Sequence, residues 1–147
     1  MTGLNRKRCV APETKIITKT YGEIEIQSKV GIELVIWNGY EWITTIVEKT
    51  GLNQPVVTVE LSGKNSLDCT LYHKWFIKHG YGSREIETKD LRSGMIIDYF
   101  SYPDSKGKLI TTMRVDDVLD SNRLCDTYSY TDPTRGRALY NGILTAV

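Results

Sequence analysis

The sequence lacks the marks of several large protein classes. No apolar run approaches the roughly 20 residues that a membrane span requires. Lys and Arg number 19 against 18 Asp and Glu, so the formal net charge of +1 gives no basic excess for nucleic acid or anionic lipid. Residues 1–8 are polar and basic with no apolar segment after them, unlike a secretory signal. We therefore expect a cytoplasmic protein that binds neither nucleic acid nor membranes.

Cysteine and histidine are also scarce. The three cysteines, Cys9, Cys69 and Cys125, contain no C-x-x-C pair, which disfavours a disulfide framework and a structural zinc site. We expect no metal and no cofactor. Of the two histidines, His79 lies in a Gly-rich turn, so acid–base chemistry near neutral pH is assigned to His73.

Residues that favour β-strands are abundant. Nine Tyr, three Trp and two Phe stand among many Ile, Val and Thr, residues that suit a half-buried pleated surface. Alternating stretches at 23–26 and 56–61 are separated by turn signals, of which Asn38-Gly39 is the strongest and Asp120-Ser121-Asn122 another. The only helix signal is one turn over 89–93. The 147 residues predict a single all-β domain of many short strands and hairpins.

Three separate segments contain residues suited to chemistry. The first begins at Cys9, followed by a small-residue turn and an apolar strand. A lone cysteine is more often a small buried hydrophobe than a nucleophile. Here the basic neighbours Arg6, Lys7 and Arg8 favour a position near the surface and a thiolate.

The other two segments are ambiguous when taken singly. His73 precedes an aromatic strand, with Thr70 three residues before it, and a histidine satisfied by backbone groups is the commoner reading of such a pattern. Asp126, beside Cys125, interrupts a strand-like run and by itself suits a turn-capping or edge carboxylate.

Taken in order, these segments resemble the conserved blocks of inteins. The matching stretches are Cys9 to Thr14, Cys69 to His73 with its Thr-x-x-His signature, Lys89 to Met95, Asp126, and Tyr140 to Thr145. The resemblance covers residues 9–147 and implies the Hint fold, an all-β horseshoe whose two chain ends meet centrally. The interval from Gly94 to Val115 is too short for a homing endonuclease, so the chain resembles a mini-intein.

The resemblance implies a self-processing reaction. The Cys9 sulfur would attack the Arg8 carbonyl in an N-to-S acyl shift, which converts the amide between them to a thioester. His73 would protonate the scissile nitrogen, and Thr70 would orient that ring or polarise the carbonyl. Asp126 would lie near the thiol and assist proton transfer.

The resemblance also implies what surrounds the domain. Residues 1–8 would be the remnant of an N-terminal extein or a tag, and 9–147 the splicing domain. Its partners would be its own flanking exteins, and we expect a monomer that reacts once on itself without turning over a substrate. The segment from Cys125 to Tyr128 is similar to inteins inserted in ribonucleotide reductases.

Two positions depart from the family pattern. Inteins typically end with His-Asn before a nucleophilic Cys, Ser or Thr, but Ala146 and Val147 follow Thr145 at this junction. The histidine common in the last block corresponds to Gly136. We therefore expect the C-terminal cyclisation to be disabled, through an engineered block or natural variation.

Three other functions remain open. A hedgehog-like domain that cleaves without ligating fits the absent His-Asn pair. A small barrel that binds single strands through Trp37, Tyr40, Trp42 and Trp75 is disfavoured by the net charge, and these aromatics suit core and cross-strand packing. A Cys-His hydrolase acting in trans is the third, and no oxyanion motif supports it.

Overall fold

The computed structural model describes residues 9–38, 41–100 and 111–131. These residues form ten β-strands and two short 3₁₀ turns. The elements are β1 (Lys15–Thr18), β2 (Gly22–Glu25), η2 (Ile26–Lys29), β3 (Glu33–Trp37), β4 (Trp42–Ile46), β5 (Glu48–Leu61), β6 (Asn65–Cys69), β7 (Lys74–His79), β8 (Gly82–Glu87), η3 (Thr88–Asp90), β9 (Ile96–Phe100) and β10 (Thr111–Ser129). Neighbouring strands pair antiparallel throughout this part of the chain, so the all-β prediction is confirmed.

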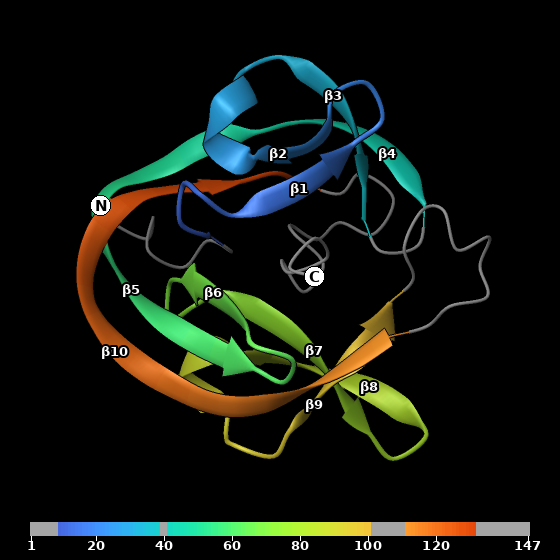
Figure 1. Cartoon of the computed structure of the whole chain (residues 1–147), viewed down its shortest axis with the longest axis vertical. Coiled ribbons are helices and arrows are strands. Elements are labelled where there is room, and N and C mark those ends of the chain that lie inside the picture. Colours follow the sequence, from blue (N-terminus) through green and yellow to red (C-terminus); the bar gives the residue numbers. More distant parts are fainter. Residues whose placement is uncertain (1–8, 39–40, 101–110, 132–147) are drawn as a thin grey trace.

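The strands form two sheets joined by a long ribbon. One sheet has the order β2-β1-β3-β4, and the other the order β6-β5-β10-β9-β7-β8. Strands β5 and β10, of 14 and 19 residues, run side by side and curve along one flank of the molecule. Figure 1 shows this ribbon linking the β1–β4 lobe to the β6–β9 lobe, which gives the predicted horseshoe. The expected meeting of the two chain ends concerns residues outside the described ranges.

A continuous apolar core lines the inside of both sheets. It includes Val10, Ile36, Val59, Trp75 and Ile97, each with no measurable exposure. Strand alternation produces this burial, because every second side chain of a β-strand points to the same face.

The tryptophans serve packing, as expected. Trp37 and Trp42 face each other across the β3–β4 hairpin, with ring centroids 5.2 Å apart and planes at 71°. Such edge-to-face pairs contribute beyond simple burial. The same register confirms a hairpin here, with residues 38–41 between the paired tryptophans, and Asn38 Oδ1 accepts the Glu41 N–H at 2.8 Å. Gly39, of the predicted Asn38-Gly39 turn, lies outside the described ranges.

Two local predictions differ from the structure. The helical turn expected over 89–93 is instead the 3₁₀ turn Thr88–Asp90, which ends where Leu91 becomes extended at ψ 143°. The turn expected at residues 120–122 is a bulge inside β10, where Asp120 pairs with Val57 and Arg123 with Val56. Asn122, at φ +53°, supplies the bend. The Asp-Ser-Asn composition encodes a local bend, and a bulge uses that bend without reversing the chain.

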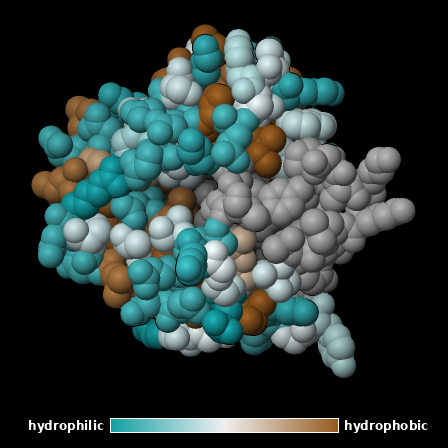
Figure 2. All heavy atoms as spheres, viewed as in Figure 1, coloured by the Kyte–Doolittle hydropathy of each residue, from teal (hydrophilic) through white to brown (hydrophobic). Residues whose placement is uncertain are grey.

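Polar side chains cover most of the described part of the face in Figure 2, with apolar ones scattered among them. Across the described ranges, no helix has the length and apolar character needed to cross a membrane.

Candidate active site around Cys9

The segment that follows Cys9 is held between the ends of two strands. Val10 N–H donates to the Tyr128 carbonyl at 3.0 Å, and Tyr128 N–H donates back to Val10 at 2.9 Å. Val10 also bridges to Cys69 at the end of β6, and Ala11 N–H donates to the Asp68 carbonyl at 2.9 Å. The N-terminal segment therefore joins β6 to β10, and its position is fixed by backbone groups.

This arrangement brings Cys9 to the Thr-x-x-His turn. Thr70 N–H donates to the Cys9 carbonyl at 3.1 Å, and His73 N–H donates to the Thr70 carbonyl at 3.2 Å. All three residues are buried, with His73 fully enclosed and both of its ring nitrogens shielded from solvent. The structure thus brings these predicted residues together, while their chemical roles remain predictions.

The expectation that Cys9 lies near the surface is wrong, because only 2% of it is exposed. The hydrogen bonds of Val10 on both sides hold the cysteine inside the junction of strands, whatever the charge of the residues before it.

The backbone of His73 is held by a residue that the sequence did not reveal. Thr88 donates to the His73 carbonyl from both its N–H, at 2.9 Å, and its hydroxyl, at 3.0 Å. The same hydroxyl accepts the Trp75 indole N–H at 2.8 Å. The Trp75 ring lies edge-on to the imidazole, with centroids 5.2 Å apart. Thr88 therefore fixes both the histidine and the aromatic side chain beside it.

A threonine hydroxyl, Thr50 Oγ1, lies at the Cys9 sulfur. It donates to Cys9 Sγ at 2.9 Å and lies 3.3 Å from Thr127 Oγ1. The Asp126 carboxylate instead pairs with Lys49 Nζ at 3.3 Å and accepts the Asn53 N–H at 3.3 Å.

The alternation of side chains along β10 accounts for this difference. Successive side chains of a strand point to opposite faces, so Thr127, next to Asp126, approaches the cysteine side. The carboxylate of Asp126 also raises the pKa of the Lys49 ammonium through their hydrogen bond. Proton transfer by Asp126 therefore remains a prediction, and the hydroxyl found at the sulfur belongs to Thr50.

An ion-pair cluster ties three site-bearing segments together. Arg123 Nη1 and Nη2 donate to the two Glu13 carboxylate oxygens at 2.7 and 2.8 Å, and Nη1 reaches Asp68 Oδ2 at 2.8 Å. Thr58 Oγ1 donates to the other Asp68 oxygen at 2.6 Å. The Arg123 guanidinium lowers the pKa of Glu13. This cluster connects the loop after Cys9 to β6 and β10.

The other two cysteines are poorly suited to act as nucleophiles. Burial raises the pKa of Cys69 to about 12 and also raises the pKa of Cys125. Both therefore stay protonated near neutral pH. Cys69 is fully buried, as expected of a small hydrophobe, whereas Cys125 is half-buried.

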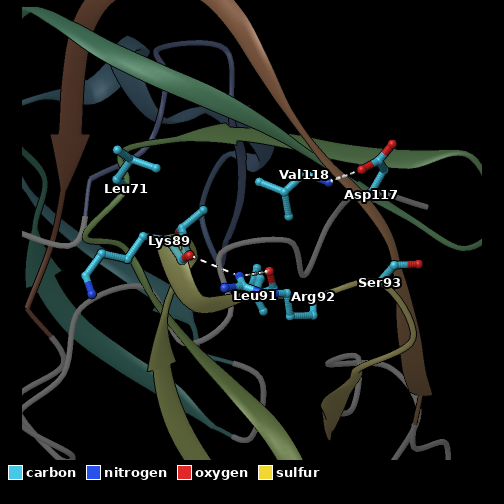
Figure 3. Close-up of a pocket in the computed structure, with 8 residues that line it drawn as sticks. Leu71, Lys89, Leu91, Arg92, Ser93, Asp117 and Val118 are labelled. Atoms are coloured by element: carbon cyan, nitrogen blue, oxygen red, sulfur yellow. Dashed lines mark hydrogen bonds between the residues drawn. The ribbon is translucent and has the colours of Figure 1, made fainter.

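A surface pocket lies behind the histidine turn. Its volume is about 390 Å³, and its lining comes from the Thr-x-x-His turn, η3 and the residues after it, and β10 (Figure 3). Arg92 folds back onto the carbonyls of Lys89 and Leu91, at 3.2 and 2.8 Å, and Val118 lies across the opening. Thr88 lines this pocket and also holds His73, so the pocket adjoins the support of the site.

The described ranges contain no group of three or more His, Cys, Asp or Glu side chains that could hold a metal ion. The predicted junction residues Arg8, Thr145, Ala146 and Val147 lie outside these ranges.

Several solved inteins have the same fold as this chain. The TvoVMA intein superposes with a TM-score of 0.74 at 19% identity, over 92% of this chain and 95% of that one. The PabCDC21-1 intein gives 0.70 at 15% identity over 95% and 98%, and the transcription factor IIB Mvu mini-intein gives 0.65 at 16% over 92% and 97%. No protein-family model matches this chain. The chain thus has the Hint fold, in the compact form of mini-inteins without an endonuclease domain, as the sequence resemblance predicted.

A sequence comparison also finds a relative of this chain. The ribonucleoside-diphosphate reductase large subunit of Invertebrate iridescent virus 6 is 32% identical over 109 residues, which cover 65% of this chain. The chain spans only 11% of that viral protein's length.

Proposed function

We propose that this chain is a protein-splicing element that breaks the peptide bond before Cys9 by an N-to-S acyl shift. The observation that carries the proposal is the linked arrangement of Cys9, Thr70 and His73. The Thr-x-x-His turn donates a hydrogen bond directly to the Cys9 carbonyl, 61 residues away in sequence. The Hint fold supports the same conclusion.

The chemistry needs no external reactant. The Cys9 sulfur forms a bond to the Arg8 carbonyl carbon, the carbon–nitrogen bond breaks, and the thiol proton ends on the departing nitrogen. The amide resists attack because resonance stabilises its plane, so protonation of the nitrogen is the demanding part. His73 is the group in this site suited to carry that proton, since an imidazole titrates near neutral pH. Burial of the site keeps competing water away.

The C-terminal half of the reaction is proposed to be blocked in this chain. Asparagine cyclisation requires a side-chain amide, and Val147 stands where the family has asparagine. The chain would then form the thioester and release its N-terminal segment to an added nucleophile. A hedgehog-like domain that only cleaves shares this first step and remains the second candidate.

The host is proposed to be a ribonucleotide reductase large subunit. The viral relative supports this, since the match covers most of this chain and a small fraction of the viral protein. The flanking reductase segments would then be the exteins, and the element would act as a monomer without a cofactor.

The test is the mass of the purified protein before and after treatment with dithiothreitol or hydroxylamine. We expect release of the segment Met1–Arg8, which Cys9→Ala abolishes. His73→Ala should slow release by about 100-fold or more, the usual contribution of a general acid, whereas the matched control His79→Ala, on the exposed β7–β8 turn, should leave it unchanged. An intact mass after prolonged treatment would overturn the proposal. Cleavage of an added peptide would favour a hydrolase acting in trans.

A further inference from the structure

The Thr50 side chain reaches the cysteine because β5 carries an extra residue at that point. Lys49 pairs with Tyr128 and Gly51 with Thr127, so one step along β10 corresponds to two along β5. Thr50 is the additional residue of this bulge. Bulges redirect a side chain out of the regular alternation and are frequent beside active sites.

The residue after Thr50 shows how tightly the bulge is packed. A Cβ atom added at Gly51 would lie 2.7 Å from Gln54 Cγ and 2.8 Å from Thr127 Oγ1. A larger residue at position 51 would force the Gln54 or Thr127 side chain to move, so glycine lets the bulge pack closely against Thr127.

Thr127 Oγ1, Thr50 Oγ1 and Cys9 Sγ form a chain of hydrogen-bonding atoms. A hydroxyl has one hydrogen to donate and two lone pairs that accept. If Thr127 donates to Thr50 across 3.3 Å, the Thr50 hydrogen points to Cys9 Sγ at 2.9 Å. Thr127 and Cys9 are 1% and 2% exposed and Thr50 is half-buried, so water has little access to the two ends of this chain of atoms.

We propose that Thr50 is a further catalytic residue, whose hydroxyl donates to the Cys9 sulfur and stabilises the thiolate as it attacks the Arg8 carbonyl. Thr127 is a positioning residue that directs this hydroxyl. Thr50 keeps its own proton throughout, and the thiol proton still ends on the departing nitrogen. This inference rests on the proposed function and adds a second side chain at the nucleophile.

The test replaces the hydroxyl without changing the shape of the side chain. Thr50→Val should slow release of the N-terminal segment about tenfold, the usual effect of losing a hydrogen bond to an ionised group. Thr50→Ser, which retains the hydroxyl, should react within about twofold of the parent. Thr127→Val should slow release by a smaller factor, and Thr127→Ser should restore it. Thr44→Val, the same change at an exposed position of β4, should have no effect.

A second readout does not depend on splicing. The ultraviolet absorbance of the thiolate that Cys9→Ala lacks, followed as the pH is raised, reports how readily the Cys9 thiolate forms and requires no reagent to reach the buried sulfur. Thr50→Val should shift this titration to higher pH, and Thr50→Ser should not. Far-UV circular dichroism checks that each variant is folded. If Thr50→Val does not fold, Thr50→Ser and Thr50→Ala provide the same comparison.

The two proposals fail differently. If the parent protein releases its N-terminal segment and Thr50→Val does so at the same rate, the role of Thr50 is overturned while the proposed function stands. Equal slowing by Thr50→Ser and Thr50→Val would also overturn it, because shape rather than the hydroxyl would be responsible. If the parent releases nothing while Thr50→Val still shifts the Cys9 titration to higher pH, the effect on the sulfur stands and the proposed function fails.

Discussion

Replacing Thr88 by valine tests the network that supports the candidate histidine. The substitution keeps the shape of the side chain and removes the hydroxyl, which accepts the Trp75 indole N–H and donates to the His73 carbonyl. The carbonyl keeps its bond from the Thr88 N–H, so it stays satisfied. The indole loses its acceptor while Trp75 remains fully buried.

The expected cost follows mainly from the indole N–H, because the Cys69 thiol, 3.5 Å from the same hydroxyl, loses only a weak hydrogen-bond partner. A buried donor left without a partner costs about 1–3 kcal/mol, so Thr88→Val should lower the free energy of unfolding by about 2 kcal/mol. In a domain of 147 residues this corresponds to a fall in Tm of about 4–8 °C. The substitution should leave no cavity, because valine has nearly the same volume as threonine.

Urea denaturation followed by tryptophan fluorescence measures this cost, and a double-mutant cycle with Trp75→Phe isolates its origin. Phenylalanine has no N–H, so in that background the cost of Thr88→Val should shrink by about 1–2 kcal/mol. An equal cost in both backgrounds would refute the reasoning, as the loss would then come from packing alone.

Three further outcomes are expected. Arg123→Met should lower the free energy of unfolding by about 1 kcal/mol at neutral pH, since the pairs it removes are partly exposed. The lowered pKa of Glu13 means that its share of this stabilisation is present above the ordinary carboxyl pKa of 4.5 and is lost as the pH falls through its folded value; a difference between parent and variant that grew on acidification would contradict this. Cys69, with a pKa of about 12, should resist iodoacetamide in the native protein and react in urea, so native labelling would refute its burial. Gly51→Ala should destabilise the protein by about 1–3 kcal/mol in urea denaturation, because the new Cβ collides with Gln54, and an unchanged midpoint would show that the bulge adapts.

Much of the fold was open to prediction because its signals are local. Alternating apolar and β-branched residues predict strands, and Asn38-Gly39 predicts the hairpin that the Trp37–Trp42 register confirms. The Thr-x-x-His turn is equally local, since His73 N–H bonds to Thr70 only three residues away. The order of these segments then matched the Hint fold.

The features that sequence analysis missed depend on contacts between segments distant in sequence. Asp120 to Asn122 predicts a bend, and only pairing with β5 determines that the bend is a bulge and not a reversal. The hydroxyl at the Cys9 sulfur could not be predicted for the same reason, because the bulge that carries Thr50 forms only when β5 pairs with β10. Burial of Cys9 depends on Val10 bonding to strands distant in sequence.

The amino-acid sequence by itself determined the strands, the hairpins and the residue types of the candidate site. Tertiary structure alone decided which hydroxyl meets the Cys9 sulfur and which groups support His73. Thr50 and Thr127 are 77 residues apart, and Glu13 and Arg123 are 110 apart. The first contact is set by the register of β5 against β10 and by its bulges, and the second by the position of the segment after Cys9 between β6 and β10. Local sequence specifies the tendency to form a strand, whereas register emerges only when two strands pair and bury a common face.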